Sequence, residues 1–95
     1  MDTEELMREL RRLKRSLEQL EAEFAHGRTD DGLLHEMDTM LENGLADDPR
    51  TEALKGMLDH LRENTLTDRP ERFADGIRHC RKLKATVEGT MSMLR

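Results

Sequence analysis

A leucine repeat near the N-terminus constrains this chain more than any other feature. Apolar side chains recur there at alternating steps of four and three, and they are Leu6, Leu10, Leu13, Leu17, Leu20 and Phe24. This spacing draws one apolar stripe along a helix, of the kind that packs lengthwise against a second helix. We therefore expect a helix over residues 3–26 that needs a long partner.

A second repeat of the same kind occupies the C-terminal third of the chain and predicts that partner over residues 69–94. Its members are Phe73, Ile77, Cys80, Val87 and Met91, with Leu83 or Lys84 filling the step between. Antiparallel pairing of the two helices would place Glu18, Glu21 and Glu23 beside Arg78, Arg81 and Lys82. Exposed ion pairs contribute only a few tenths of a kcal/mol, about 0.3, so these charges select the orientation while the apolar seams supply the stability.

Two shorter helices are expected between the long ones. The first covers residues 30–43 and ends at Gly44, because glycine readily adopts the left-handed conformation that closes a helix. The second covers residues 49–64, because Asp48 can cap a helix whose first position is Pro49.

Composition leaves no other class of fold open. Charged residues make up 39% of the chain and apolar residues 35%, while phenylalanine, at two positions, is the only aromatic type. Only one isoleucine and one valine occur, so runs that favour β-strands are missing. We predict an all-α fold: one antiparallel helical-bundle domain, residues 1–95, with two long coiled-coil-like helices joined by two shorter ones. An open dimer that exchanges these helices between chains is the rival arrangement.

The expected location of the protein is the cytoplasm. No segment reaches the roughly 18 consecutive apolar residues of a membrane span, and the first residues are acidic, unlike a secretory signal. Cys80 is the single cysteine, and its position in the seam predicts a buried, reduced thiol.

Catalytic and cofactor motifs do not stand out. Cys80 follows His79 directly, and adjacent side chains of a helix point about 100° apart, so the two do not form a nucleophile with its base. The glycines are scattered instead of forming a phosphate-binding loop. We expect no enzymatic activity and no cofactor.

Metal-binding patterns are incomplete. Asp31 and His35 stand one helical turn apart with Asp38 nearby, but a transition-metal site needs three or four convergent ligands and only one of these is an imidazole. Glu23 and His26 have the spacing of di-iron carboxylate bundles, which require that pair twice. No metal site is expected.

The middle of the chain is strongly acidic. Residues 30–59 carry nine carboxylates against two basic side chains. Within them Asp31, His35, Asp38 and Glu42 fall in one stripe on the expected outer face of the helix. Such a stripe can dock on a basic site of another protein, or it can be a solvated face that keeps the protein soluble.

A basic cluster, Arg8 to Arg15, is the one feature that points toward nucleic acid. It lacks aromatic stacking partners and belongs to a chain of net charge −5, so nucleic-acid binding is not expected. The leading hypothesis is a non-enzymatic protein-binding module, a small adaptor, chaperone-like or regulatory protein that acts through helical faces and can form a homodimer. The alternative is an acidic inhibitor or nucleic-acid mimic that blocks a basic site through residues 30–59.

Overall fold

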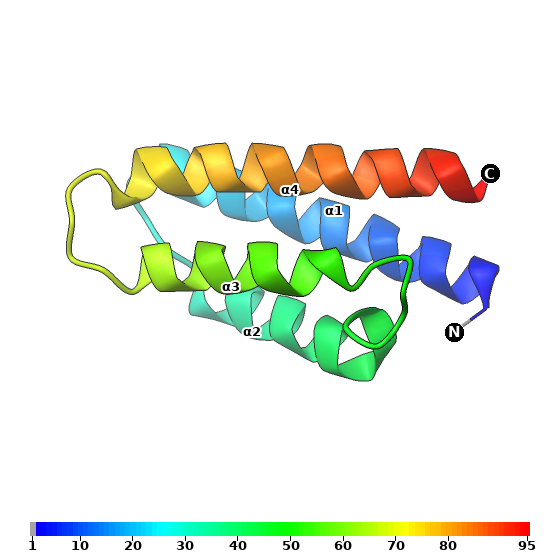
Figure 1. The fold of residues 1–95 in the computed structure, drawn as a ribbon. Helices are drawn as coiled ribbons and strands as arrows, with labels where there is room; N and C mark the ends of the chain where they lie inside the picture. Colours follow the sequence, from blue (N-terminus) through cyan, green and yellow to red (C-terminus); the bar gives the residue numbers. More distant parts are fainter. Residues whose placement is uncertain (1) are drawn as a thin grey trace.

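The protein folds as a bundle of four α-helices, and the computed structural model describes residues 2–95. The helices are α1 (Thr3–Ala25), α2 (Asp31–Met40), α3 (Ala53–Thr65) and α4 (Arg72–Leu94), and a π-helical turn, η1 (Leu41–Leu45), continues α2 (Figure 1). The described residues include no strand. The prediction of an all-α bundle with two long and two short helices is confirmed.

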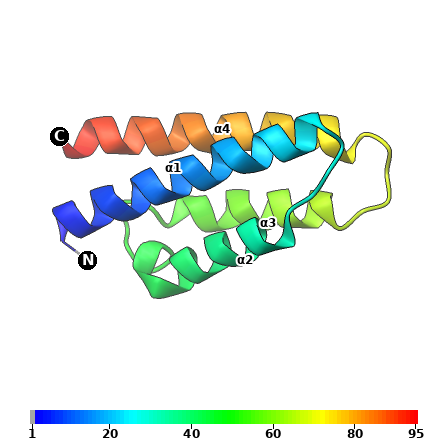
Figure 2. The same ribbon diagram turned by 180° about the vertical axis from the view of Figure 1, so that it is seen from behind.

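The two long helices lie side by side and antiparallel. The start of α1 and the end of α4 are at the same end of the bundle, and α2 and α3 form a hairpin along one side of the pair (Figures 1 and 2). α1 begins where the side chain of Asp2 accepts a hydrogen bond from the backbone N–H of Glu5 at 2.8 Å. It ends before Gly27, whose φ of 69° is the left-handed conformation that glycine adopts readily after a helix.

The core follows the two predicted seams. All six seam residues of α1 are at most 2% exposed, and Cys80, Val87 and Met91 of α4 are buried. Leu83, not Lys84, fills the remaining step of the α4 seam, while Phe73 and Ile77 are half-buried at its edge. The hairpin completes the core with Met37, Met40, Leu41, Leu45, Leu54, Leu58 and Leu61.

Phe24 fixes the register of α1 against α4. Its ring centroid lies 6.3 Å from that of Phe73 in a tilted arrangement, a favourable geometry for two aromatic rings. The same ring covers Gly76, where an added Cβ would lie 2.7 Å from two of the ring carbons. The glycine therefore allows α4 to approach the aromatic side chain closely.

Charged pairs of opposite sign flank the seam. Glu21 pairs with Arg81 at 3.2 Å and Glu18 with Lys84 at 3.8 Å. Lys14 and Glu88 form a third pair, at 3.2 Å. Of the other predicted partners, Glu23 and Arg78 pair instead within their own segments, with Arg28 and Asp75 respectively. Lys82 forms no ion pair with any described residue, so its predicted pairing is wrong.

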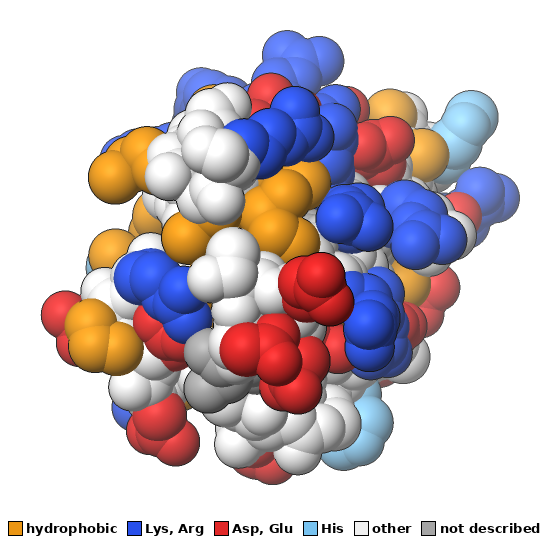
Figure 3. Space-filling view, turned by 90° about the vertical axis from the view of Figure 1, so that its right-hand side faces the viewer, with side chains coloured by type: hydrophobic (Ala, Val, Ile, Leu, Met, Phe, Trp, Pro, Cys, Tyr) orange, Lys and Arg blue, Asp and Glu red, His pale blue; other side chains and the backbone are white. Residues whose placement is uncertain are grey.

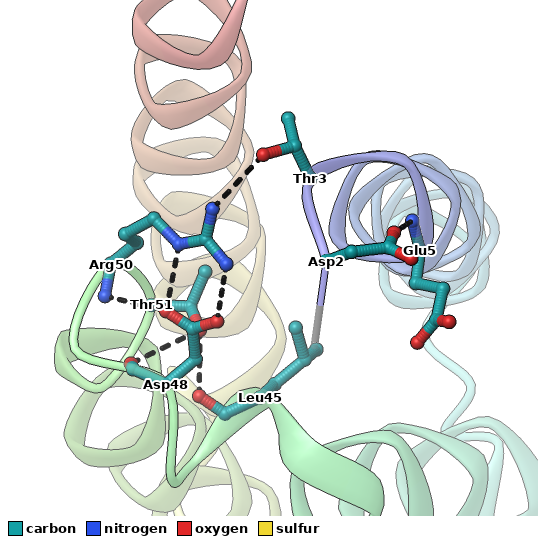
Figure 4. A network of polar contacts seen from close by, with 7 residues as sticks. All are labelled: Asp2, Thr3, Glu5, Leu45, Asp48, Arg50 and Thr51. Atoms are coloured by element: carbon teal, nitrogen blue, oxygen red, sulfur yellow. Dashed lines mark hydrogen bonds and ion pairs between the residues drawn. The ribbon is translucent and has the colours of Figure 1, made fainter.

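The prediction that α3 opens at Pro49 is wrong, because α3 begins at Ala53 after a series of turns. Asp48 does not cap a helix. Its Oδ1 accepts hydrogen bonds from the backbone N–H and the Nε of Arg50, at 2.9 and 3.0 Å, and its Oδ2 from Nη2 at 2.8 Å (Figure 4). Nη1 of Arg50 also donates to Thr3 Oγ1 at 3.3 Å, so this turn is fastened to the start of α1.

Helix α4 also starts later than predicted, at Arg72 instead of residue 69. The residue before a proline is disfavoured in the helical conformation, so Arg69 stays outside the helix that would include Pro70. The N–H of Arg72 donates to the carbonyl of Arg69 at 3.1 Å and closes a turn there. η1, in contrast, ends as predicted near Gly44, which has a φ of 133°.

Acid is expected to weaken the turn that Asp48 holds. The hydrogen bonds from the side chain and then the backbone of Arg50 lower the pKa of the Asp48 carboxyl from its ordinary 3.8 to about 2. Its contribution to stability is therefore complete above pH 3.8 and is lost as the pH falls through about 2. Urea unfolding of the parent and of Asp48→Asn should show a difference in midpoint that is constant from pH 5 to 7 and shrinks between pH 4 and 2. A difference independent of pH over this range would contradict the assignment.

Candidate functional site

A polar groove runs between α1 and α2 and consists of two adjoining hollows. The larger has a volume of about 510 Å³ and is lined by Arg12, Arg15, Ser16, Gln19 and Glu36. The smaller, about 300 Å³, is lined by Glu5, Arg8, Glu9, Arg12, Glu36, Thr39, Met40 and Asn43. Arg12 and Glu36 line both hollows, so they stand at the boundary between them. We call the whole feature the α1–α2 groove.

The boundary between the hollows is a loose ion pair. Nη2 of Arg12 lies 3.6 Å from Oε1 of Glu36, which is longer than a hydrogen bond. Nη1 of the same guanidinium lies 3.2 Å from Oε1 of Glu9, one turn earlier on α1. A guanidinium has five N–H donors, so Arg12 keeps donors for a further acceptor.

Ser16 is the unusual member of the groove. It is only 4% exposed, yet its hydroxyl makes no hydrogen bond with any described residue. Threonine hydroxyls in the helices of this bundle do find a partner, the carbonyl four residues earlier, as Thr39 does with His35 and Thr86 with Lys82, both at 3.0 Å. The Ser16 hydroxyl therefore stays a spare donor and acceptor beside the larger hollow.

Three arginines of α1, namely Arg8, Arg11 and Arg15, have no ion-pair or hydrogen-bond partner within the described part of the chain. Arg8 and Arg15 line the α1–α2 groove, one at each hollow. Arg11 lies outside the groove, in a separate hollow with Met7. Sequence reasoning noted the basic cluster but singled out neither Ser16 nor Gln19.

The predicted acidic stripe is only partly an outer face. Asp31, His35 and Glu42 are exposed, as expected. Asp38 instead turns toward α3 and pairs with Arg62, which also lies 3.7 Å from Asp59. The spacing of Asp38 and Glu42 along α2 correctly places them one turn apart. The spacing could not show, however, that Arg62 of α3 would pair with Asp38.

Much of the acidic middle segment is engaged inside the bundle. Asp30 caps α2 by accepting from the N–H of Leu33 at 3.1 Å, and Glu36, Asp38, Asp48 and Asp59 each pair with an arginine. The carboxylates of this segment that have no partner among the described residues are Asp31, Glu42, Asp47 and Glu52. The surface is therefore less negative than the count of carboxylates suggests.

Two histidines line the same hollow between α3 and α4. His60 and His79 line a hollow of about 70 Å³ together with Met57, Lys82 and Leu83. Burial, followed by the charge of His60, lowers the pKa of His79. Residues 2–95 contain no group of three or more histidine, cysteine, aspartate or glutamate side chains placed to hold a metal ion.

The thiol of Cys80 is expected to be almost inert while the protein is folded. It is 1% exposed, and burial, with a smaller effect of the Glu21 charge, raises its pKa from 9.0 to about 12. Three pKa units reduce the thiolate roughly thousandfold at pH 8. An aromatic disulfide reagent should therefore label the native protein on the timescale of unfolding and the denatured protein at once. Rapid labelling under native conditions would contradict this prediction.

The end of the bundle that carries the start of α1 and the end of α4 shows hydrophobic side chains at the surface among basic and acidic ones (Figure 3). Met93 is 86% exposed, whereas Met7 and Met91 are buried.

None of the described helices is both long enough and apolar enough to cross a membrane. Comparison of the chain with models of protein families, with curated proteins and with solved structures finds no match.

Proposed function

We propose that this chain is a non-enzymatic, cytoplasmic protein-binding module that acts through its helical faces, as a small adaptor, chaperone-like or regulatory protein. The supporting observation is how its charges are distributed. Ion pairs flank the α1·α4 seam, whereas Arg8, Arg11 and Arg15 on α1 have no partner among the described residues. Surface arginines on a rigid helix are common anchors of protein interfaces.

The acidic inhibitor or nucleic-acid mimic is supported less well. A mimic needs a dense array of carboxylates that face solvent, and five of the nine in residues 30–59 already have internal partners. Asp31 and Glu42 remain exposed. This proposal therefore rests on a smaller surface than the sequence implied.

A homodimer through α1 also has less support than binding to another protein. Self-pairing would need the acidic half of α1 to meet the basic half of a second copy. Glu18, Glu21 and Glu23 are, however, already paired with Lys84, Arg81 and Arg28. Few free carboxylates are left for the second copy.

Affinity capture from native cell extract, with three baits, tests the proposal. The baits are the parent, a variant with Arg8, Arg11 and Arg15 changed to glutamine, and a variant with Asp31→Asn and Glu42→Gln. We expect the parent to retain one protein stoichiometrically and the arginine variant to lose it, at least tenfold in yield. Loss confined to the acidic variant, with a basic protein as the captured species, would favour the inhibitor. Retention of nothing by any bait would contradict both proposals. Far-ultraviolet circular dichroism of each bait controls for folding.

A further inference from the structure

The larger hollow of the α1–α2 groove gathers hydrogen-bond donors on one wall. The side chains of Arg12, Arg15, Ser16 and Gln19 all line it. Successive spacings of three, one and three residues put these four on one side of α1. Glu36 of α2 is the single carboxylate of the opposite wall. Two guanidiniums, a hydroxyl and a carboxamide form a donor set that suits an oxyanion.

Ser16 is the most sheltered member of this donor set. The residue is only 4% exposed and has no hydrogen-bond partner among residues 2–95, yet none of the described side-chain oxygens is both buried and unsatisfied, so the Ser16 hydroxyl still reaches solvent. It is therefore free to donate to an acceptor that enters the hollow. An alanine there would fit the helix better. The hydroxyl gains a role if an acceptor enters the hollow beside it.

The two arginines can receive that acceptor. Arg15 has no partner within the described residues, and the Nη2 of Arg12, whose Nη1 is bound by Glu9 at 3.2 Å, is held by Glu36 only at 3.6 Å. An incoming carboxylate could therefore bridge the two guanidiniums while Glu36 moves toward solvent. Glu36 is 44% exposed in its side chain, so it loses little on release.

We infer that the α1–α2 groove binds carboxylate side chains of an acidic segment of a partner protein, with Arg12, Arg15, Ser16 and Gln19 donating to one carboxylate. The inference rests on the proposed protein-binding function and names the surface and the chemistry that it uses. The adjoining hollow, lined in part by Met40, Thr39 and Asn43, accommodates a neighbouring side chain of the same segment.

The surroundings favour a short acidic segment over a long polyanion. The basic stretch of α1 spans residues 8–15, about 10 Å at ~1.5 Å per residue. Glu4 and Glu5 precede it, Glu18 follows it, and Glu9 and Glu36 lie within the groove. A nucleic-acid backbone that continued past the arginines would meet these carboxylates, whereas one or two acidic side chains would not.

The test uses two alanine-based helical peptides that carry three glutamates or, in the control, three glutamines at the same positions. Each peptide is titrated into ¹⁵N-labelled protein and followed by nuclear magnetic resonance. We expect the glutamate peptide to shift the amides of Ser16 and Gln19 and the Gln19 carboxamide in a saturable way. The glutamine peptide should leave these signals in place.

Arg15→Gln and Arg11→Gln form a matched pair for this titration. Both arginines are exposed, belong to α1 and lack partners among the described residues, but only Arg15 lines the groove. Arg15→Gln should weaken binding of the glutamate peptide about tenfold, and Arg11→Gln by less than about twofold. Equal weakening by both variants would overturn the inference in favour of unspecific attraction.

Ser16→Ala separates a ligand-binding hydroxyl from a structural one. It should raise the thermal midpoint of the free protein, because alanine favours the helix, and it should weaken peptide binding at least threefold. If Ser16→Ala bound the glutamate peptide with unchanged affinity, the Ser16 hydroxyl would have no part in binding. If inorganic phosphate shifted the same signals at a lower concentration than the glutamate peptide does, the inference that the groove binds an acidic peptide segment would be wrong. Failure of the titration, with a protein still captured by the Arg15→Gln bait, would refute the groove and leave the protein-binding function standing.

Discussion

Replacing Leu13 with alanine should lower the free energy of unfolding by about 3–4 kcal/mol. Leu13 is fully buried at the middle of the α1 seam and belongs to the single core that α1, α4 and the hairpin share. Two effects add up: the favourable free energy of burying the deleted carbon atoms is lost, and a cavity is left in the core. A domain of this size has on the order of 5–15 kcal/mol of total stability, so the variant should unfold at a visibly lower urea concentration.

Leu66→Ala provides the control for this substitution. Leu66 is 73% exposed in the turn after α3, so the same chemical change should alter the free energy of unfolding by less than about 0.5 kcal/mol. Chemical denaturation of both variants under one set of conditions measures the difference. Equal effects of the two substitutions would show that α1 does not supply the core of the bundle.

Gly76→Ala should lower stability, by up to about 2 kcal/mol, even though alanine favours helices. The added Cβ would lie 2.7 Å from two carbons of the Phe24 ring, which is itself only 2% exposed and packed against Phe73. Helix propensity alone would raise stability by about 1 kcal/mol, but forcing an extra methyl into a packed core costs about 1–3 kcal/mol. Because the ring is buried and already packed against Phe73, we expect the steric cost to exceed the gain.

Gly89→Ala is the matched control on the same helix. Apart from its chain neighbours and the backbone of its own helix, no described atom lies within 4 Å of the added Cβ, so the backbone effect acts alone and stability should rise by about 0.5–1 kcal/mol. Thermal unfolding followed by circular dichroism should therefore move the midpoints of the two variants in opposite directions. A rise in both would mean that the Phe24 ring can turn aside at little cost.

The long helices could be predicted from the sequence because their pattern repeats over many turns. Each of six seam positions in α1 adds to the same stripe, so one ambiguous residue changes little. The prediction of where α3 starts depended on a single capping residue, Asp48. In the structure the carboxylate of Asp48 accepts hydrogen bonds from Arg50 instead of capping the helix. The contact of Arg50 with Thr3 joins residues 47 positions apart, and local patterns carry no information about such a pairing.

The candidate site was harder to predict than the fold. A polar stripe through Arg12, Ser16 and Gln19 could be read along one side of the leucine seam. Nothing in the spacing shows that α2 packs near it yet leaves a groove, because that depends on the turn between α1 and α2. The acidic stripe was easier to see, but Asp38 found its partner on α3.

The order of the helices has a consequence for synthesis of the protein. The apolar seam of α1 is covered mainly by α4, which follows α1, α2 and α3 in the chain, and α1 and α4 share the most extensive helix pairing in the bundle. At about 5–20 residues per second, several seconds pass between the appearance of α1 and that of α4. Until then only α2 and α3 can shield the leucines of the nascent chain, so α1 is the segment that a ribosome-associated chaperone would meet.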